Sequence, residues 1–170
     1  INPNYLDAYL NFGIALKKFQ KYQDAIDCFQ HALKINPNNA RIFYVLGEVY
    51  YDIGNLDLAK INYAKSLELN TNDLLAQYAF AIAQIPKVCK NDEEISESRI
   101  AFSRSLETLE ASLTQENNPA NASILIARHP FSLAYQNENN EPLLSRYGLI
   151  CTRQAQIIQD GININKRDAK

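Results

Sequence analysis

A set of seven positions recurs 34 residues along the chain with similar side chains. The first copy has Tyr9, Phe12, Gly13, Leu16, Ala25, Phe29 and Ala32, and the second has Phe43, Leu46, Gly47, Tyr50, Ala59, Tyr63 and Ser66. Within each copy the apolar residues follow one another at three- and four-residue spacing, which is typical of helices with one buried face. A short repeat of this kind buries its apolar face only against its neighbours, so the first half of the chain is predicted to be a stack of helical hairpins.

The period and the spacing resemble those of tetratricopeptide repeats. Repeat one covers residues 6–39, with helices expected near 7–19 and 22–35, and repeat two covers residues 40–73. The run Asn36-Pro37-Asn38-Asn39 is expected to end one helix and to cap the next. Gly13 and Gly47 are expected to let the paired helix approach closely. The aromatic residues of the pattern, Phe12 among them, are predicted to lie in the core.

The flanking segments complete an all-α prediction, a tetratricopeptide helical-hairpin solenoid followed by a helical linker and capping region. Residues 1–5 repeat the pattern around Pro37, so we interpret them as the end of a truncated preceding repeat. Pro86 interrupts the third copy, so residues 74–86 are predicted to be the capping helix of a degenerate repeat. Residues 87–170 are predicted to be a helical linker region, with helices at 92–114 behind the cap Asn91, at 123–128, and from Pro142 to a stop at Gly161.

The overall composition argues against several classes of function. The 17 basic and 19 acidic residues give a net charge of −2 without a block of like charge, so neither nucleic acid nor a membrane is a predicted partner. The three cysteines are far apart and form no CxxC pair, so no metal site or disulfide framework is predicted, and we interpret them as reduced thiols of a cytoplasmic protein. No run is apolar and long enough to span a bilayer.

No catalytic residues are found in the sequence. There is no glycine-rich phosphate loop, and neither His31 nor His129 has a partner at the spacing of a catalytic triad or a metal site. His31 is interpreted as a solvated side chain. No cofactor is predicted in this segment, and whether the chain belongs to an enzyme stays open at this point.

The region after the repeats contains four ordered motifs. They are Ile85-Pro86, then Asp92-Glu93-Glu94-Ile95 with Arg99, then Pro130-Phe131-Ser132-Leu133-Ala134-Tyr135-Gln136, and last Leu143-Leu144-Ser145-Arg146-Tyr147. Their order resembles the segment that joins the repeats to the catalytic half of bacterial SPINDLY-type proteins, although Ser132 replaces an aromatic residue of that family and Asn137 a glycine. Such proteins are similar to O-linked N-acetylglucosamine transferases. The resemblance implies a sugar-nucleotide-dependent catalytic domain after Lys170, with His129, Phe131, Tyr135 and Gln136 as linker contacts to it.

The recognition surface follows from the resemblance to the repeats. In tetratricopeptide superhelices the first helix of each repeat lines the concave wall, at the positions held here by Asp7, Leu10, Asn11, Ile14, Lys17, Lys18, Arg41, Tyr44, Val45, Glu48, Tyr51 and Asp52. Asn11 matches an asparagine that bonds the peptide backbone of substrates in the transferase family, and the alternative is a solvated side chain. Repeats that clamp a C-terminal carboxylate use lysine and asparagine where this chain has Leu10, Ile14, Tyr44 and Glu48, which disfavours that ligand.

Two functions are therefore compatible with the sequence. The first is a protein-interaction scaffold, as the substrate-presenting repeat and linker segment of a SPINDLY-like protein O-glycosyltransferase. The alternative is a stand-alone adaptor that binds a partner peptide or helix and has no associated enzyme activity.

Overall fold

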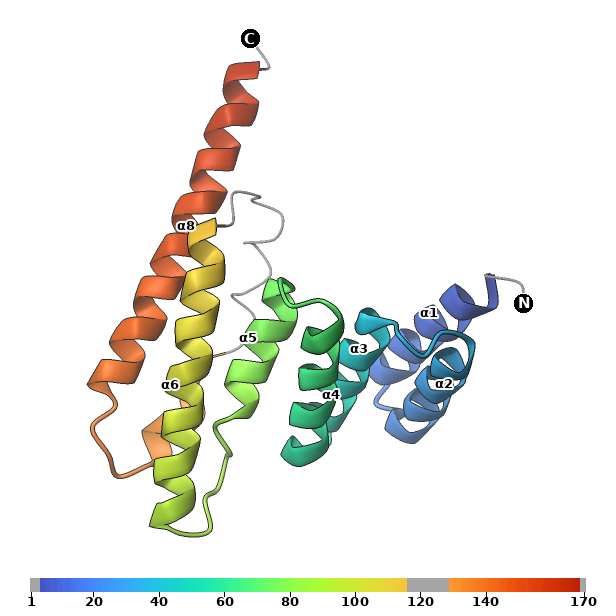
Figure 1. The fold of residues 1–170 in the computed structure, drawn as a ribbon, viewed down its shortest axis with the longest axis horizontal. Helices are drawn as coiled ribbons and strands as arrows, with labels where there is room; N and C mark the ends of the chain where they lie inside the picture. The colour runs from blue at the N-terminus through green and yellow to red at the C-terminus, as the bar shows by residue number, and fades with distance from the viewer. Residues whose placement is uncertain (1–3, 116–128, 169–170) are drawn as a thin grey trace. The chain divides into compact units, whose positions relative to one another are not determined.

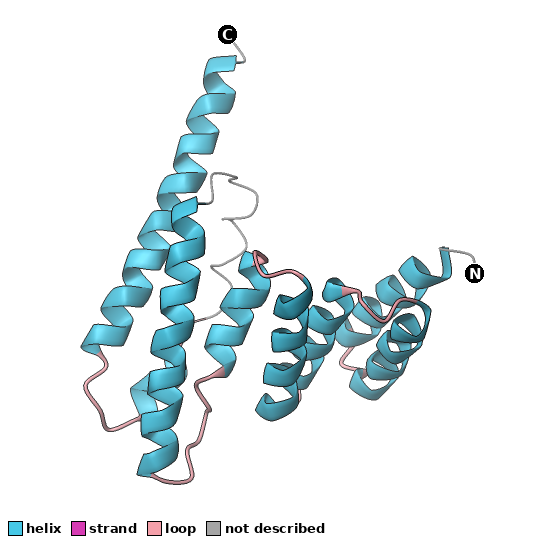
Figure 2. Cartoon of the chain, in the orientation of Figure 1, coloured by secondary structure: helices cyan, strands magenta, loops and turns pink. Residues whose placement is uncertain are grey.

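The computed structural model describes residues 4–115 and 129–168. Figure 2 shows that the described segments are helices and their connections, with no strand among them. The chain divides into two compact units, residues 1–71 and 72–170, and each is described by itself. The prediction of an all-α fold is confirmed.

The first unit consists of two helical hairpins. It contains α1 (Asn4–Lys18), α2 (Tyr22–Ile35), α3 (Ala40–Asp52) and α4 (Leu56–Leu69). Helix α1 pairs with α2 and α3 pairs with α4, while α2 also packs against α3 (Figure 1). Asparagine side chains set the starts of two helices, because Asn39 Oδ1 accepts from the Ile42 N–H at 3.2 Å and Asn55 Oδ1 from the Leu58 N–H at 3.1 Å.

In each hairpin the two helices approach closely at a glycine, as predicted. A Cβ atom on Gly13 would lie 2.5 Å from Cε1 of Phe29, and one on Gly47 would lie 2.5 Å from Cδ1 of Tyr63. Both rings are fully buried. The missing side chain of glycine is therefore what allows an aromatic residue of the second helix to lie against the first.

The prediction that Phe12 lies in the core is wrong. Phe12 is 60% exposed, whereas Leu46, at the same position of repeat two, is 4% exposed. Leu46 lies on α3, which packs against α2, and it joins the core formed with Ile26 and Phe29. Within the described residues of the first unit, no helix covers the corresponding face of α1.

The second unit is built around a long central helix. It contains α5 (Leu74–Ala83), α6 (Asp92–Gln115), the 3-10 helix η2 (Phe131–Tyr135) and α8 (Glu141–Asp168). Helix α6 packs against both α5 and α8 (Figure 1). Its side chains Phe102, Leu106 and Leu109 are fully buried. The predicted cap of α6 is confirmed, since Asn91 Oδ1 accepts from the Glu94 N–H at 2.8 Å.

The last helix differs from its prediction. Helix α8 continues through Gly161 to Asp168, so the predicted stop at Gly161 is wrong. A glycine in a helix interior costs only about 1 kcal/mol relative to alanine, which does not by itself end a helix. The helix expected at residues 123–128 lies outside the described residues.

Candidate functional site

Lysine and carboxylate side chains join the first helices of the two repeats. Lys17 Nζ on α1 lies 3.0 Å from Asp52 Oδ2 and 3.5 Å from Glu48 Oε2, both on α3. The Tyr63 hydroxyl of α4 donates to Glu48 Oε1 at 2.6 Å. All three charged side chains are partly shielded from water, which weakens screening and strengthens the pairing. Glu48 and Asp52 thus neutralise Lys17, the cation that a carboxylate ligand would need. The same ion pairs hold α1 beside α3.

Some residues predicted to line the concave wall are buried beneath its surface instead, and we call them its floor. Leu10 is 3% exposed and Val45 is 8% exposed, and both belong to the core of the first unit, so their prediction as contact residues is corrected. Ile14 and Tyr44 are half-buried and pack against the same core. Tyr51 is also half-buried. Apolar side chains at this spacing turn toward α2 and α4 because burial there removes them from water.

Among the residues predicted to line the concave wall, those that reach solvent are polar. They are Asp7, Asn11, Lys18, Arg41 and Asp52, which we call the repeat surface. Their spacing of three or four residues, or a multiple of it, places them along one face of each helix. Formal charges of two acids and two bases cancel, so the repeat surface has no net charge. The described part of the chain supplies no hydrogen-bond partner for the Asn11 amide, which is therefore free to bond a peptide backbone.

The predicted linker contacts divide into buried and exposed residues. Phe131 and Tyr135 are exposed and lie edge to face, with ring centroids 5.6 Å apart. Gln136 is buried, and its Oε1 accepts from Arg99 at 3.2 Å. His129 is exposed to solvent, and its Nδ1 lies 3.5 Å from the Tyr147 hydroxyl.

Arg99 organises the turn that contains these residues. Its guanidinium donates to Gln136 Oε1, Asn140 Oδ1 and the carbonyl oxygen of Asn139, and Asn140 Nδ2 donates to the Leu133 carbonyl at 2.8 Å. We call these side chains the linker network. Arginine has only donors, so it fixes the Gln136 carboxamide with oxygen toward α6 and nitrogen away from it. The sequence did not reveal this network, because Arg99 lies 37 to 41 residues before its three partners and no period relates them.

A buried pair of tyrosines joins α5 to α8. The hydroxyl oxygens of Tyr78 and Tyr147 are 3.0 Å apart. Burial, followed by the hydrogen bond with Tyr78, raises the pKa of Tyr147 above its ordinary value, so this phenol stays neutral at physiological pH. In the first unit, burial and then the nearby Asp27 and Asp24 raise the pKa of the Cys28 thiol, which makes it a poor nucleophile.

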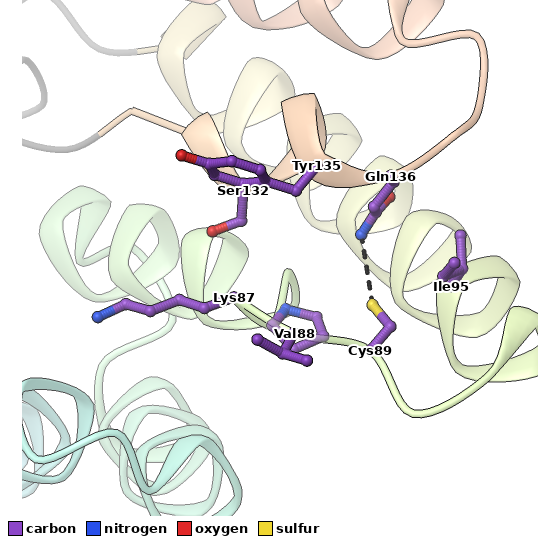
Figure 3. A pocket seen from close by; sticks show the side chains of 8 residues that line it. Lys87, Val88, Cys89, Ile95, Ser132, Tyr135 and Gln136 are labelled. Carbon is purple, nitrogen blue, oxygen red and sulfur yellow. Dashed lines mark hydrogen bonds between the residues drawn. The ribbon is translucent and has the colours of Figure 1, made fainter.

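A cleft opens beside the exposed aromatic pair. It has a volume of about 430 Å³, and its walls are residues 86–89, Ile95 of α6, and Ser132, Tyr135 and Gln136. Figure 3 shows Ser132 and Tyr135 on one side and Lys87 and Val88 on the other, with the Gln136–Cys89 contact at one end. We call it the linker cleft. Tyr135 and Gln136 were named from the sequence, but the opposite wall, residues 86–89, was not.

The described ranges 4–115 and 129–168 contain no group of three or more His, Cys, Asp or Glu side chains that could hold a metal ion. No described helix combines the length and the apolar character that crossing a membrane requires.

Comparison with known families identifies the repeats. Residues 15–54 match the family described as TPR repeat, and residues 40–73 match the family described as Tetratricopeptide repeat. Residues 15–73 are therefore tetratricopeptide repeats, as their spacing predicts, and the first unit is a protein-interaction scaffold.

Segments of three longer proteins are similar to this chain. Peptidyl-prolyl cis-trans isomerase FKBP4 of Mus musculus is 22% identical over 79% of this chain, Heat shock protein STI1 of Saccharomyces cerevisiae is 32% identical over 44%, and Protein O-mannosyl-transferase TMTC3 of Homo sapiens is 32% identical over 48%. The matches span 28%, 13% and 9% of those proteins.

The fold also resembles a solved structure. The crystal structure of MamA superposes with a TM-score of 0.59 at 15% identity, over 95% of this chain and 83% of that one. At that identity the likeness concerns the fold alone.

Proposed function

We propose that the repeat surface binds an extended segment of a partner protein. The observation that carries the proposal is the arrangement of α1 and α3, with a buried apolar floor at Leu10 and Val45 beneath exposed polar side chains of no net charge. Amide and charged groups above such a floor suit contacts with a peptide backbone, which every sequence offers. The repeat surface would then recognise the extended backbone of a protein segment more than its charge.

The cluster around Lys17 argues against a C-terminal carboxylate as the ligand. Lys17 is paired with Glu48 and Asp52, and a carboxylate would have to displace one of them while the other repelled it. Lys18 and Arg41 are the exposed cations of the repeat surface, and Asp7 and Asp52 offset them. This supports a neutral or mixed-charge segment.

Site-specific photo-crosslinking in the native cells tests the binding surface. A crosslinking residue in place of Asn11 is expected to capture a partner that the same residue in place of Gln30, an exposed amide on α2, does not capture. Excess chain should compete with the capture, and excess chain with Arg41→Glu should compete poorly. Equal capture from both positions would refute the proposal.

The finer proposal is that the chain presents protein substrates as the repeat and linker segment of a SPINDLY-like O-glycosyltransferase. The ordered motifs from Ile85 to Tyr147 support it, and the exposed Phe131 and Tyr135 offer an apolar surface to a catalytic lobe. The donor would be a sugar nucleotide bound outside this chain, and the setting would be the cytoplasm of a bacterium.

Deletion in the parent protein separates the finer proposal from its alternative. Removing residues 1–73 is expected to lower glycosylation of a protein substrate while hydrolysis of the sugar nucleotide continues. Unchanged glycosylation would refute substrate presentation. A stand-alone adaptor instead predicts full partner binding and full cellular function without any sugar donor.

A further inference from the structure

We propose that the linker cleft is a second peptide-binding site, which takes an internal peptide segment with an aliphatic side chain next to an Asp or Glu. The proposal concerns the second unit alone and does not rest on the ligand of the repeat surface. Its volume of about 430 Å³ lies within the range of sites that bind small ligands or side chains.

The polar groups of the linker cleft are mainly hydrogen-bond donors. Gln136 is more than nine-tenths buried, and the hold of Arg99 on its oxygen turns Nε2 into the cleft. There, within the described residues, the one hydrogen-bond partner of Nε2 is Cys89 Sγ at 3.7 Å, and sulfur is a weak acceptor. A peptide carbonyl would be a better acceptor for this amide. Ser132 Oγ has no hydrogen-bond partner in the described part of the chain and adds a second donor.

The apolar and charged residues that line the linker cleft indicate which side chains the peptide carries. Pro86, Val88 and Ile95 supply apolar surface, and Val88 is 83% exposed, so a partner's aliphatic side chain would cover it. Of the described residues that line the linker cleft, Lys87 alone is charged, so a carboxylate is the complementary charge.

The distance between the Lys87 ammonium and the Gln136 amide favours an internal peptide segment over a chain terminus as the ligand. In Figure 3 the Lys87 side chain extends to the left, away from the Gln136 amide, which points down toward Cys89 on the right, so the two groups lie at different ends of the linker cleft. One terminal carboxylate cannot reach both groups. A carbonyl at Gln136 and an acidic side chain at Lys87 fit a peptide that passes through the cleft.

The test uses the full 170-residue chain labelled with nitrogen-15 and a short peptide, Gly-Asp-Leu-Gly, that is acetylated and amidated. We expect a dissociation constant of about 1 mM or tighter, with chemical-shift changes at the Gln136 side-chain amide and at the backbone amides of residues 87–89. Peptides with Lys for Asp, or Ala for Leu, are expected to bind at least tenfold more weakly. No saturable shift would overturn the proposal, and tighter binding of an unblocked Gly-Gly-Leu would assign the cleft to chain termini instead.

Two substitutions probe the cleft without loss of the fold. Gln136→Glu keeps an acceptor for Arg99 but replaces the amide donor, and it should weaken binding about tenfold. Lys87→Glu should weaken binding of the Asp peptide about tenfold and favour the Lys peptide, while Lys90→Glu, the same charge change on an exposed residue outside the lining, should have no effect. Equal effects of the two lysine variants would refute a direct contact.

Discussion

Substitution of Gly47 by alanine tests the packing that holds the second repeat together. The added Cβ would lie 2.5 Å from Tyr63, whose ring is fully buried and whose hydroxyl donates to Glu48 at 2.6 Å. Overpacking of this kind costs about 1–3 kcal/mol. Moving the ring also strains a hydrogen bond to a charged group, worth about 1.5 kcal/mol or more. The higher helix propensity of alanine offsets about 1 kcal/mol of this cost, so we expect a net loss of about 1.5–3.5 kcal/mol.

Two other glycines provide matched comparisons. Gly148 is exposed within α8, and a Cβ there meets no atom within 4 Å, so Gly148→Ala should stabilise the protein by about 0.5–1 kcal/mol. Gly13→Ala meets Phe29, which has no hydroxyl to hold it, and should cost less than Gly47→Ala. Urea unfolding followed by far-ultraviolet circular dichroism measures all three. If Gly47→Ala were as stable as Gly148→Ala, the packing argument would be wrong.

Three further predictions use the same unfolding assay. Leu46→Ala should cost about 2–5 kcal/mol, whereas Phe12→Ala should cost less than about 1 kcal/mol because Phe12 is exposed; equal costs would contradict the burial difference. Arg99→Ala removes the donor to the buried Gln136 and the half-buried Asn140 and should cost about 2–3 kcal/mol, and a neutral result would show that the linker network contributes nothing. The raised pKa of Tyr147 means that the unfolded state loses its proton first, so stability should fall as pH rises above about 10, by up to about 1.4 kcal/mol per pH unit. Tyr147→Phe should remove that slope, and an unchanged slope would assign it to other groups.

Local signals in the sequence were enough to place most helices. Residues 22–35 were predicted as a helix and form α2, and the predicted helix 92–114 is α6 within one residue. The starts of α3 and α6 depend on the nearby caps Asn39 and Asn91, which can be recognised without knowledge of the rest of the fold.

Properties that depend on a neighbouring helix were not predictable in the same way. The repeat pattern gives Phe12 and Leu46 the same position, but α2 of the preceding repeat packs against α3, whereas no described helix of the first unit covers the Phe12 face of α1. The same limit applies to Leu10, whose burial follows from the packing of the hairpin.

The linker cleft could not be predicted from the sequence for a different reason. Its walls come from the connection after α5 and from η2, two irregular segments that no period relates to each other. Gln136 was named from a resemblance to the transferase family, yet its contact with Arg99 became visible only in three dimensions.

The most direct test of the central claim is the affinity of the crosslinked partner segment for two variants of the chain, measured by calorimetry. Asn11→Ala removes an exposed amide from the repeat surface, and Gln30→Ala removes one from α2. We expect Asn11→Ala to weaken binding roughly threefold to tenfold, the value of about one hydrogen bond, and Gln30→Ala to leave it unchanged. Unchanged affinity for Asn11→Ala, or an equal loss for both variants, would contradict recognition of a peptide backbone at the repeat surface.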